Sequence, residues 1–230
     1  MIRAAIIGAN GYTGMELMRL LAAHPDVEIG MAASRSLAGT RVAATYPTLA
    51  GRYGDMEYTA PDLDKAAECD VAFACLPHGE SAEICGKLVD AGTRVIDLSA
   101  DYRYDDVSLY EATYKKEHPR KDLAAEAVYG LPEYNRARIR GARLVGNIAM
   151  YDVSVTHPSY VIDKRTVIVD AKSGVSGAGR KSDVAYNFNE TEGNFKAYGV
   201  TTHRHTTEIE EKSGAVVTFT PHLLPVMRDI

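Results

Sequence analysis

Cysteine, tryptophan and long apolar runs are scarce in this chain of 230 residues, which contains three cysteines and no tryptophan. Cys69, Cys75 and Cys85 form no CxxC pair and have no histidine at zinc-ligand spacing, so the sequence predicts neither a disulfide framework nor a bound metal. The apolar N-terminal residues reach Gly8 at once and are too few for a secretory signal or a membrane span. We therefore expect a cytoplasmic protein that does not contact a membrane.

A surplus of positive charge is also missing. The chain has 26 Lys and Arg against 31 Asp and Glu, a formal net charge of −5, so nucleic acid is not an expected partner. Apolar residues make up 46%, which suits a globular protein of one large domain or two small ones. Basic residues gather only locally, and such clusters suit a small anionic substrate as the partner.

The first half of the chain alternates short apolar runs with helix-like segments, the pattern of a parallel sheet covered by helices. Strands are predicted at residues 3–7, 27–33, 71–76, 94–98 and 143–146, and helices at 13–23 and 81–91. Residues 34–61 are predicted as a loop region, and residues 101–140 as loops and short helices at the sheet edge. An apolar stripe at helical spacing makes Cys85 an expected core residue.

A second domain is predicted to begin at residue 148. Strands are expected at 166–171 and 216–220, while the residues between them carry glycine, lysine and histidine rather than a helical pattern. About eighty residues are marginal for an independent core. The predicted fold class is therefore α/β, with a Rossmann-type doubly wound parallel sheet in residues 1–147 that binds NADP, followed by a truncated α+β substrate and dimerisation domain in residues 148–230.

A glycine-rich turn, GANGYTG, joins the first predicted strand to the first predicted helix. In a dinucleotide-binding turn, the first glycine permits a sharp bend, the second admits a pyrophosphate close to the backbone, and the third lets helix pack on strand. Amides at the start of the helix then attract the anion. The spacing is GxxGxxG rather than GxGxxG, so a glycine turn without a ligand is the alternative. The residues expected to contact a dinucleotide are Gly8, Asn10, Gly11, Tyr12, Thr13 and Gly14.

The end of the second predicted strand indicates which dinucleotide is bound. Sites for NAD place a carboxylate there to bind the ribose 2′-hydroxyl, whereas this chain continues Ser34-Arg35-Ser36. A guanidinium pairs with a 2′-phosphate through two hydrogen bonds, and the serine hydroxyls add donors. We therefore predict NADP(H) as the cofactor, with Ser34 and Arg35 at its 2′-phosphate. The alternative is that Arg35 is a solvated loop residue.

Three further segments carry residues suited to chemistry. Pro77 and His78 follow a predicted strand at the carboxyl edge of the sheet, where open α/β folds bind ligands. The segment KSGVSGAGR, residues 172–180, combines backbone freedom with two cations and suits a phosphate or a carboxylate. His203 and His205 are two residues apart, so both would face one side of an extended segment. A metal would need further ligands at supporting positions, and only His222 is available, so a metal is not expected.

Several of these segments resemble one enzyme family, in order along nearly the whole chain. The motifs are GANGYTGMEL, the ASR turn, LPHG, DLSADYR, YGLPE, VIVDAKSGVSGAGR, YGVTTHRHT and FTPHL. Together they are similar to the N-acetyl-γ-glutamyl-phosphate reductase family, whose members use NADPH in arginine biosynthesis. Aspartate-semialdehyde dehydrogenase has the same general arrangement of motifs, but it does not combine KSGVSGAGR with HRHT.

The resemblance implies an oxidoreductase that converts N-acetyl-γ-glutamyl phosphate to N-acetylglutamate semialdehyde. In that family a cysteine thiolate displaces phosphate, and NADPH reduces the resulting thioester. His203 matches the family's general acid/base, with His205 as the second candidate. A homo-oligomer formed through the second domain is also implied. The expected cofactor contacts include Pro77, His78, Ser173, Gly174 and Gly177, and the expected substrate contacts are Asn147, Lys172, Arg180 and Arg204.

One motif departs from the family. The family nucleophile lies in Asn-Pro-Gly-Cys-Tyr, whereas this chain has Asn147-Ile148-Ala149-Met150-Tyr151, so Met150 stands in the position of the cysteine. A thioether has no proton to lose, and attack through it gives a sulfonium, so the thioester route closes at this residue. Between Met150 and Lys164 the chain is also shorter than the family pattern and lacks its helical apolar run, a second helix of the family is shortened between Glu211 and Val216, and the family continues beyond residue 230. An NADP(H)-binding pseudoenzyme, or a cut-down relative without catalysis, is therefore the alternative to a reductase.

Overall fold

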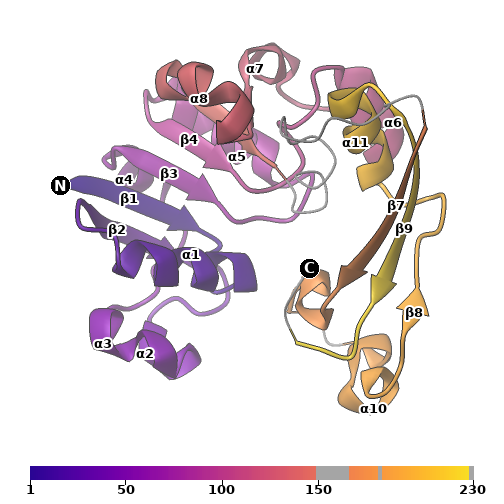
Figure 1. Cartoon of the computed structure of the whole chain (residues 1–230). Helices are drawn as coiled ribbons and strands as arrows, with labels where there is room; N and C mark the ends of the chain where they lie inside the picture. The colour runs from indigo at the N-terminus through magenta and orange to yellow at the C-terminus, as the bar shows by residue number, and fades with distance from the viewer. Residues whose placement is uncertain (149–165, 181–182, 228–230) are drawn as a thin grey trace.

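The computed structural model describes residues 1–148, 166–180 and 183–227, which form two lobes (Figure 1). The first lobe contains a six-stranded sheet in the order β2-β1-β3-β4-β6-β5, and every neighbouring pair in it is parallel. The second lobe contains a three-stranded sheet in the order β7-β9-β8. A Rossmann-type parallel sheet followed by a smaller lobe confirms the predicted α/β class.

The strands of the first lobe agree closely with those predicted. They are β1 (Ile2–Ile7), β2 (Val27–Ala33), β3 (Val71–Ala74), β4 (Arg94–Asp97), β5 (Val128–Gly130) and β6 (Leu144–Asn147). The edge strand β5 lies in the segment predicted as loops and short helices. It has three residues, too few for a period-two apolar pattern to be recognised.

The helices of the first lobe are α1 (Tyr12–Ala22), α2 (Val42–Thr45), α3 (Ala50–Tyr53), α4 (Leu63–Ala67), α5 (Ser81–Asp90), α6 (Val107–Tyr114), α7 (Lys121–Glu126) and α8 (Pro132–Gly141), with the 3-10 turn η1 (Pro47–Leu49). The prediction of a loop region at residues 34–61 is therefore incomplete, because α2, η1 and α3 lie within it. None of the helices in the described ranges has the length and apolar character to cross a membrane.

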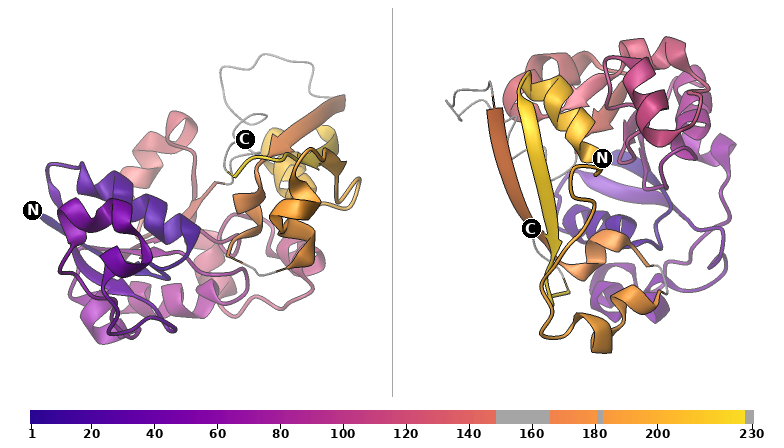
Figure 2. Two further views of the ribbon diagram at one scale, coloured as in Figure 1. Left: turned by 90° about the horizontal axis from the view of Figure 1, so that it is seen from below. Right: turned by 90° about the vertical axis from the view of Figure 1, so that its right-hand side faces the viewer.

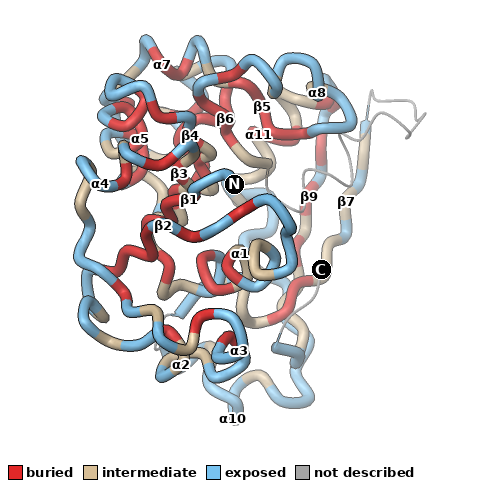
Figure 3. The backbone as a smooth tube through the Cα atoms, turned by 90° about the vertical axis from the view of Figure 1, so that its left-hand side faces the viewer, coloured by how far each residue is buried: buried red, intermediate tan, exposed pale blue. Residues whose placement is uncertain are grey.

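Small side chains in the central strands let helices pack closely on both faces of the large sheet. On one face, Cys85 and Leu88 of α5 pack against Ala72 of β3 in a common cluster. On the other face, Met15 and Met18 of α1 belong to a second cluster. Cys85 is fully buried, which confirms its predicted place in the core. Figure 3 shows buried residues concentrated along the strands and inner helix faces of this lobe.

The second lobe is built on β7 (Thr166–Ser173), β8 (Lys196–Ala197) and β9 (Val216–Leu223), with α10 (Phe188–Thr191), α11 (His205–Ser213) and the 3-10 turns η2 (Val175–Ala178) and η3 (Val184–Tyr186). β9 lies between the other two strands, parallel to β7 and antiparallel to β8. Figure 2 shows α11 on the side of the β7–β9 ribbon that faces the first lobe. Ile209 of α11 packs there against Val217 and Phe219.

Helix α11 contradicts the prediction made from residue patterning, which expects no helix between the two strands, although the family resemblance implies a shortened helix before Val216. Its sequence, HTTEIEEKS, contains one aliphatic residue, Ile209, so no apolar periodicity identifies it. Its buried face is completed by Glu208 and Ser213 instead. A helix that buries a carboxylate needs a partner for it, and the first lobe supplies that partner.

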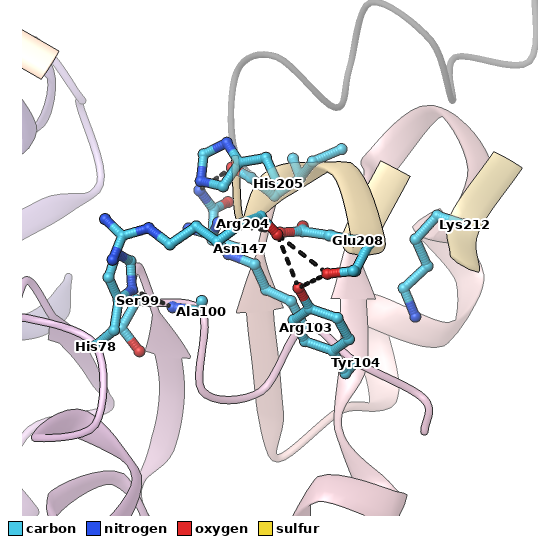
Figure 4. A network of polar contacts seen from close by, with 12 residues as sticks. His78, Ser99, Ala100, Arg103, Tyr104, Asn147, Arg204, His205, Glu208 and Lys212 are labelled. Carbon is cyan, nitrogen blue, oxygen red and sulfur yellow. Dashed lines mark hydrogen bonds and ion pairs between the residues drawn. The ribbon is translucent and has the colours of Figure 1, made fainter. Parts of the chain in front are cut away.

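A buried ion pair joins the two lobes. Arg103, in the loop after β4, places Nη1 3.4 Å from Oε2 of Glu208, and the two side chains are 6% and 0% exposed. The hydroxyl of Tyr129 donates to the other carboxylate oxygen at 3.2 Å, and Arg103 Nη2 donates to the carbonyl of Leu98 at 3.0 Å. Figure 4 labels Arg103 and Glu208 where α11 meets the first lobe. The pair therefore anchors α11 against the carboxyl edge of the parallel sheet.

Contacts at the rim extend this anchor. The Glu211 carboxylate accepts from the backbone amides of Asp105 at 3.1 Å and Asp106 at 2.8 Å. Lys212 Nζ lies 2.7 Å from the Asp105 carboxylate and 4.8 Å from the ring centroid of Tyr129. The loop after β4 therefore contacts three residues of α11, which are Glu208, Glu211 and Lys212.

We predict that Glu208→Ala lowers the free energy of unfolding by about 3–5 kcal/mol, because it leaves the Arg103 guanidinium buried without its carboxylate. Urea unfolding followed by circular dichroism measures this change. Glu190→Ala, at an exposed position of α10, is the control and should shift stability by no more than about 0.5 kcal/mol. Equal losses for the two variants would contradict an anchor made by this ion pair.

Candidate functional site

A cavity of about 530 Å³ lies between the two lobes. Figure 1 shows the carboxyl ends of β1, β3 and β4 pointing toward the second lobe, and this edge is where open α/β folds bind ligands. The wall of the cavity comes from the start of α1, the loops after β3 and β4, the loop around η2 and the start of α11. Its lining includes Thr13, His78, Arg103, Ser173, Gly174, Gly177, Lys196, His203, Arg204 and His205.

The glycine turn has two glycines that the fold requires and one that it does not. Gly8 has a φ of +85°, and a Cβ there would lie 2.2 Å from the carbonyl oxygen of Cys75. A Cβ on Gly14 would lie 2.6 Å from Cα of Ala9. A Cβ on Gly11 would meet an ordinary contact of 3.5 Å. Packing does not explain Gly11, whereas close approach of an external group to the backbone does.

The start of α1 presents amides suited to an anion. Gly11 precedes the helix without a side-chain cap, and the first intrahelical bond runs from the amide of Met15 to the carbonyl of Gly11 at 2.9 Å. The amides of Tyr12, Thr13 and Gly14 therefore precede that bond, and first-turn amides have no acceptor within their own helix. The helix dipole adds positive potential at the same place. The turn fits the pyrophosphate of a dinucleotide.

Two side chains hold the carbonyl of Asn10 in this turn. Tyr46 Oη and Arg180 Nη1 each donate to it at 2.8 Å. Arg180 comes from the second lobe and also lies over the ring of Tyr46, 5.6 Å from its centroid. The structure therefore places Arg180 at the glycine turn, outside the lining of the cavity, and its substrate contact stays a prediction.

Arg35, the predicted reader of a 2′-phosphate, forms an ion pair with Glu80 in this structure, with Nη2 2.7 Å from Oε2. Ser34 is buried, and its hydroxyl accepts from the amide of Leu37 at 3.1 Å, so it shapes the turn after β2. Ser36 is exposed and accepts from Asn10 Nδ2 at 3.3 Å. The Arg35 loop thus lies beside the glycine turn, as a 2′-phosphate site requires.

The loop after β3 is fixed by polar contacts with the loop after β4. The Asp101 carboxylate accepts from the amides of Gly79 at 2.7 Å and Ala82 at 3.0 Å, which starts α5. His78 Nδ1 accepts from the amide of Ala100 at 3.0 Å (Figure 4), so a neutral ring carries its hydrogen on Nε2. Burial, with a contribution from Arg204, lowers the pKa of His78 to about 4.

His203 and His205 meet as predicted, but not on an extended segment. Their ring centroids are 4.8 Å apart, because a turn leads directly into the first residue of α11. His203 Nδ1 accepts from the amide of His205 at 3.2 Å, which leaves the hydrogen of a neutral ring on Nε2. Burial lowers the pKa of His203 to about 4 and that of His205 to about 2, and nearby Arg204 contributes to both.

The cations of the cavity differ from those predicted. Among its lining residues are Arg103, Lys196 and Arg204, of which the sequence prediction contains only Arg204. Figure 4 shows the Arg204 side chain extending toward His78. Lys172 instead pairs with Asp170 at 2.5 Å on β7 and is not among the lining residues. The DLSADYR motif contains Arg103, but Lys196 lies in no motif that could have identified it.

The nucleophile position itself, Met150, lies outside the described residues. Asn147, at the end of β6, donates from Nδ2 to the carbonyl of Ile148 at 3.3 Å. Burial raises the pKa of the Cys75 thiol to about 12 and raises the pKa values of Cys69 and Cys85 as well. None of these cysteines is a thiolate near neutral pH, so none offers a ready nucleophile.

Two family models cover most of the chain. Residues 3–142 match the NAD-binding domain of semialdehyde dehydrogenases, and residues 152–230 match their dimerisation domain. The N-acetyl-γ-glutamyl-phosphate reductase of Laribacter hongkongensis is 47% identical over 242 residues, which cover 100% of this chain and 70% of that protein. The reductase of the same name from Symbiobacterium thermophilum is also 47% identical, with coverage of 100% and 69%.

Solved structures of aspartate-semialdehyde dehydrogenases have the same fold. The Vibrio cholerae enzyme II superposes with a TM-score of 0.69 at 17% identity, over 99% of this chain and 71% of that one. The Candida albicans enzyme with NADP gives 0.65 at 16% identity, over 99% and 69%. With a shared fold and relatives at nearly half identity, the chain belongs to the N-acetyl-γ-glutamyl-phosphate reductase family of semialdehyde dehydrogenases.

Proposed function

We propose that the chain binds NADP(H) and a small acidic acyl phosphate between its lobes, as an NADPH-dependent reductase of N-acetyl-γ-glutamyl phosphate. One observation carries this proposal: a single cavity is lined by the start of α1, the Ser173 loop and the turn that holds His203. Relatives with 47% identity bear the name of that enzyme. Residues 1–147 serve as the NADP-binding domain in this proposal, and residues 148–230 as the substrate and dimerisation domain.

The cofactor is assigned to residues around the glycine turn. The first-turn amides of α1 bind the pyrophosphate, and Arg35 with Ser34 and Ser36 is assigned to the 2′-phosphate. Gly174 and Gly177 line the same cavity as Thr13, where their backbone can approach the rest of the dinucleotide. When bound, NADPH supplies a hydride. The proposed cofactor contacts of the two loops are Pro77, His78, Ser173, Gly174 and Gly177.

The protein's own groups provide charge and protons for the substrate. Arg204, Lys196 and Arg103 place positive charge on the cavity wall, which suits a phosphate and a carboxylate. His203 in its neutral form donates from Nε2, so it is proposed as the hydrogen-bond donor to a substrate oxygen, with His205 as the second candidate. Asn147, Lys172 and Arg180 remain proposed substrate contacts from the family pattern.

The assembly and compartment are inferred from separate observations. Residues 152–230 match a dimerisation domain. Ile168 and Val216, on the second sheet, are 79% and 65% exposed, as a surface awaiting a second copy would be. We infer a homo-oligomer.

Three free cysteines and no disulfide among them suit the reducing cytoplasm.

A second candidate function is an NADP(H)-binding protein without turnover. The observation that favours it is the methionine at position 150, together with thiols whose pKa values are all raised by burial. Two measurements separate the candidates. Phosphate-dependent reduction of NADP by N-acetylglutamate semialdehyde, above a heat-denatured control, supports the reductase. Quenching of NADPH fluorescence without turnover supports the binding protein. If neither turnover nor quenching is observed, both candidate functions are rejected.

Arg35→Ala should weaken NADPH binding about tenfold and NADH binding less than about twofold, because only NADPH carries the phosphate that a guanidinium can pair with. Titration of the protein into each reduced dinucleotide, followed by fluorescence, measures the two dissociation constants. Equal losses for both cofactors would show that Arg35 does not contact the 2′-phosphate.

Met150→Cys alone should leave the rate at least about 100-fold below that of the Laribacter relative, because Ile148 and Ala149 replace the Pro-Gly backbone that shapes the nucleophile loop, and small misplacement costs that much. Steady-state reduction of NADP with both proteins measures the ratio. A triple variant that restores Pro-Gly-Cys is the comparison. Near-equal rates for the single variant and the relative would contradict this expectation.

His203 and His205 should stay neutral between pH 5.5 and 8, since burial places their pKa values near 4 and 2, below the ordinary value of about 6.5. The unfolded chain binds protons there below pH 6.5 and the folded chain does not, so the free energy of unfolding should fall as the pH is lowered from 6.5 toward 4. Nitrogen-15 NMR of the imidazoles, assigned with His203→Asn and His205→Asn, tests this. A midpoint near 6.5 for either ring would refute it.

A further inference from the structure

Glu80 places a carboxylate against the guanidinium that is proposed to bind the 2′-phosphate. Arg35 Nη2 lies 2.7 Å from Glu80 Oε2, and the side chains are 69% and 46% exposed. We propose that Glu80 is a specificity-determining residue, which lowers the preference of the cofactor site for a 2′-phosphorylated dinucleotide over an unphosphorylated one. The inference rests on the proposed binding of NADP(H).

The topology of the sheet brings this pair to the cofactor turn. In the order β2-β1-β3, the strand β1 and its glycine turn lie between β2 and β3. Arg35 follows β2 and Glu80 follows β3, so the two side chains reach toward each other across the turn that follows β1. Ser36 is joined to Asn10 of that turn by a hydrogen bond of 3.3 Å. A dinucleotide seated on the turn therefore meets both charges at one end.

The fold does not need the Glu80 carboxylate. Glu80 precedes α5 but makes no side-chain cap. Asp101 takes that role, because its two carboxylate oxygens accept from the amides of Gly79 and Ala82 at 2.7 Å and 3.0 Å. The carboxylate of Glu80 is thus left to pair with Arg35 across the loops.

The consequence for the cofactor follows from charge. A 2′-phosphate must share Arg35 with the Glu80 carboxylate or displace that carboxylate. The phosphate and the carboxylate are both negatively charged, so they repel each other when they are close together. An exposed ion pair is weak, so the phosphate still binds. A 2′-hydroxyl meets no repulsion and can donate to the carboxylate, which is the contact that NAD sites use. The pair of Arg35 and Glu80 therefore reduces the difference in binding affinity between NADPH and NADH.

Glu80→Gln tests this proposal. We expect the ratio of the NADH to the NADPH dissociation constant to rise about three- to tenfold, mainly because NADPH binds more tightly. Fluorescence titration of the intact chain with each reduced dinucleotide gives the ratio, at low and at high salt. Glu83→Gln is the matched control, because Glu83 is exposed in the first turn of α5, just after Glu80, and pairs with Lys87 at 2.9 Å instead. Circular dichroism confirms that both variants are folded.

The Arg35→Ala background separates the possible outcomes. If Glu80 acts through Arg35, the effect of Glu80→Gln on the ratio falls below about twofold in that background. An unchanged or lower ratio for Glu80→Gln alone overturns the proposal, and so does an effect of full size without Arg35. Wild-type protein that binds neither dinucleotide defeats the proposed function itself. Wild-type protein that binds NADPH, with no shift in the variant, defeats only the role of Glu80.

Discussion

The buried pair between Arg103 and Glu208 is the constraint on which the geometry of the cavity depends. Each charge alone inside the protein would cost several kcal/mol, so the loop after β4 and α11 must meet for either to be buried. Because α11 begins at His205, fixing that helix also fixes the two imidazoles and Arg204 opposite the carboxyl edge of the large sheet. An interaction that serves stability thereby also positions the groups that are proposed to act in catalysis and binding.

Burial beside fixed arginines gives the cavity an uneven distribution of charge. Arg103 and Arg204 line the cavity, and burial, with Arg204 nearby, lowers the pKa values of His78 and His203 to about 4. In both histidines a backbone amide occupies Nδ1 and leaves the hydrogen on Nε2. The wall therefore offers permanent cations for an anion and neutral rings as donors, without depending on the pH near neutrality.

The glycine turn, at residues 8–14, and the altered nucleophile position, at Met150, lie far apart in the sequence. The turn is formed by β1, the start of α1 and the loops after β2 and β3, and Arg180 of the second lobe donates to its Asn10 carbonyl. A chain can therefore keep a dinucleotide site in good order while its nucleophile loop changes. That separation makes both a reductase and a cofactor-binding protein physically consistent with one fold.

The sequence by itself determined the parallel sheet, the glycine turn and the buried stripe around Cys85, because spacing along a strand, turn or helix is local. It did not reveal α11, whose one aliphatic residue gives no pattern, nor the cavity cations Arg103 and Lys196. Only the tertiary structure brought Arg103 to Glu208, 105 residues away, and Arg180 to Asn10, 170 residues away. Such partners are chosen by how the lobes pack, and packing between distant segments leaves no periodic trace in the residues that make it.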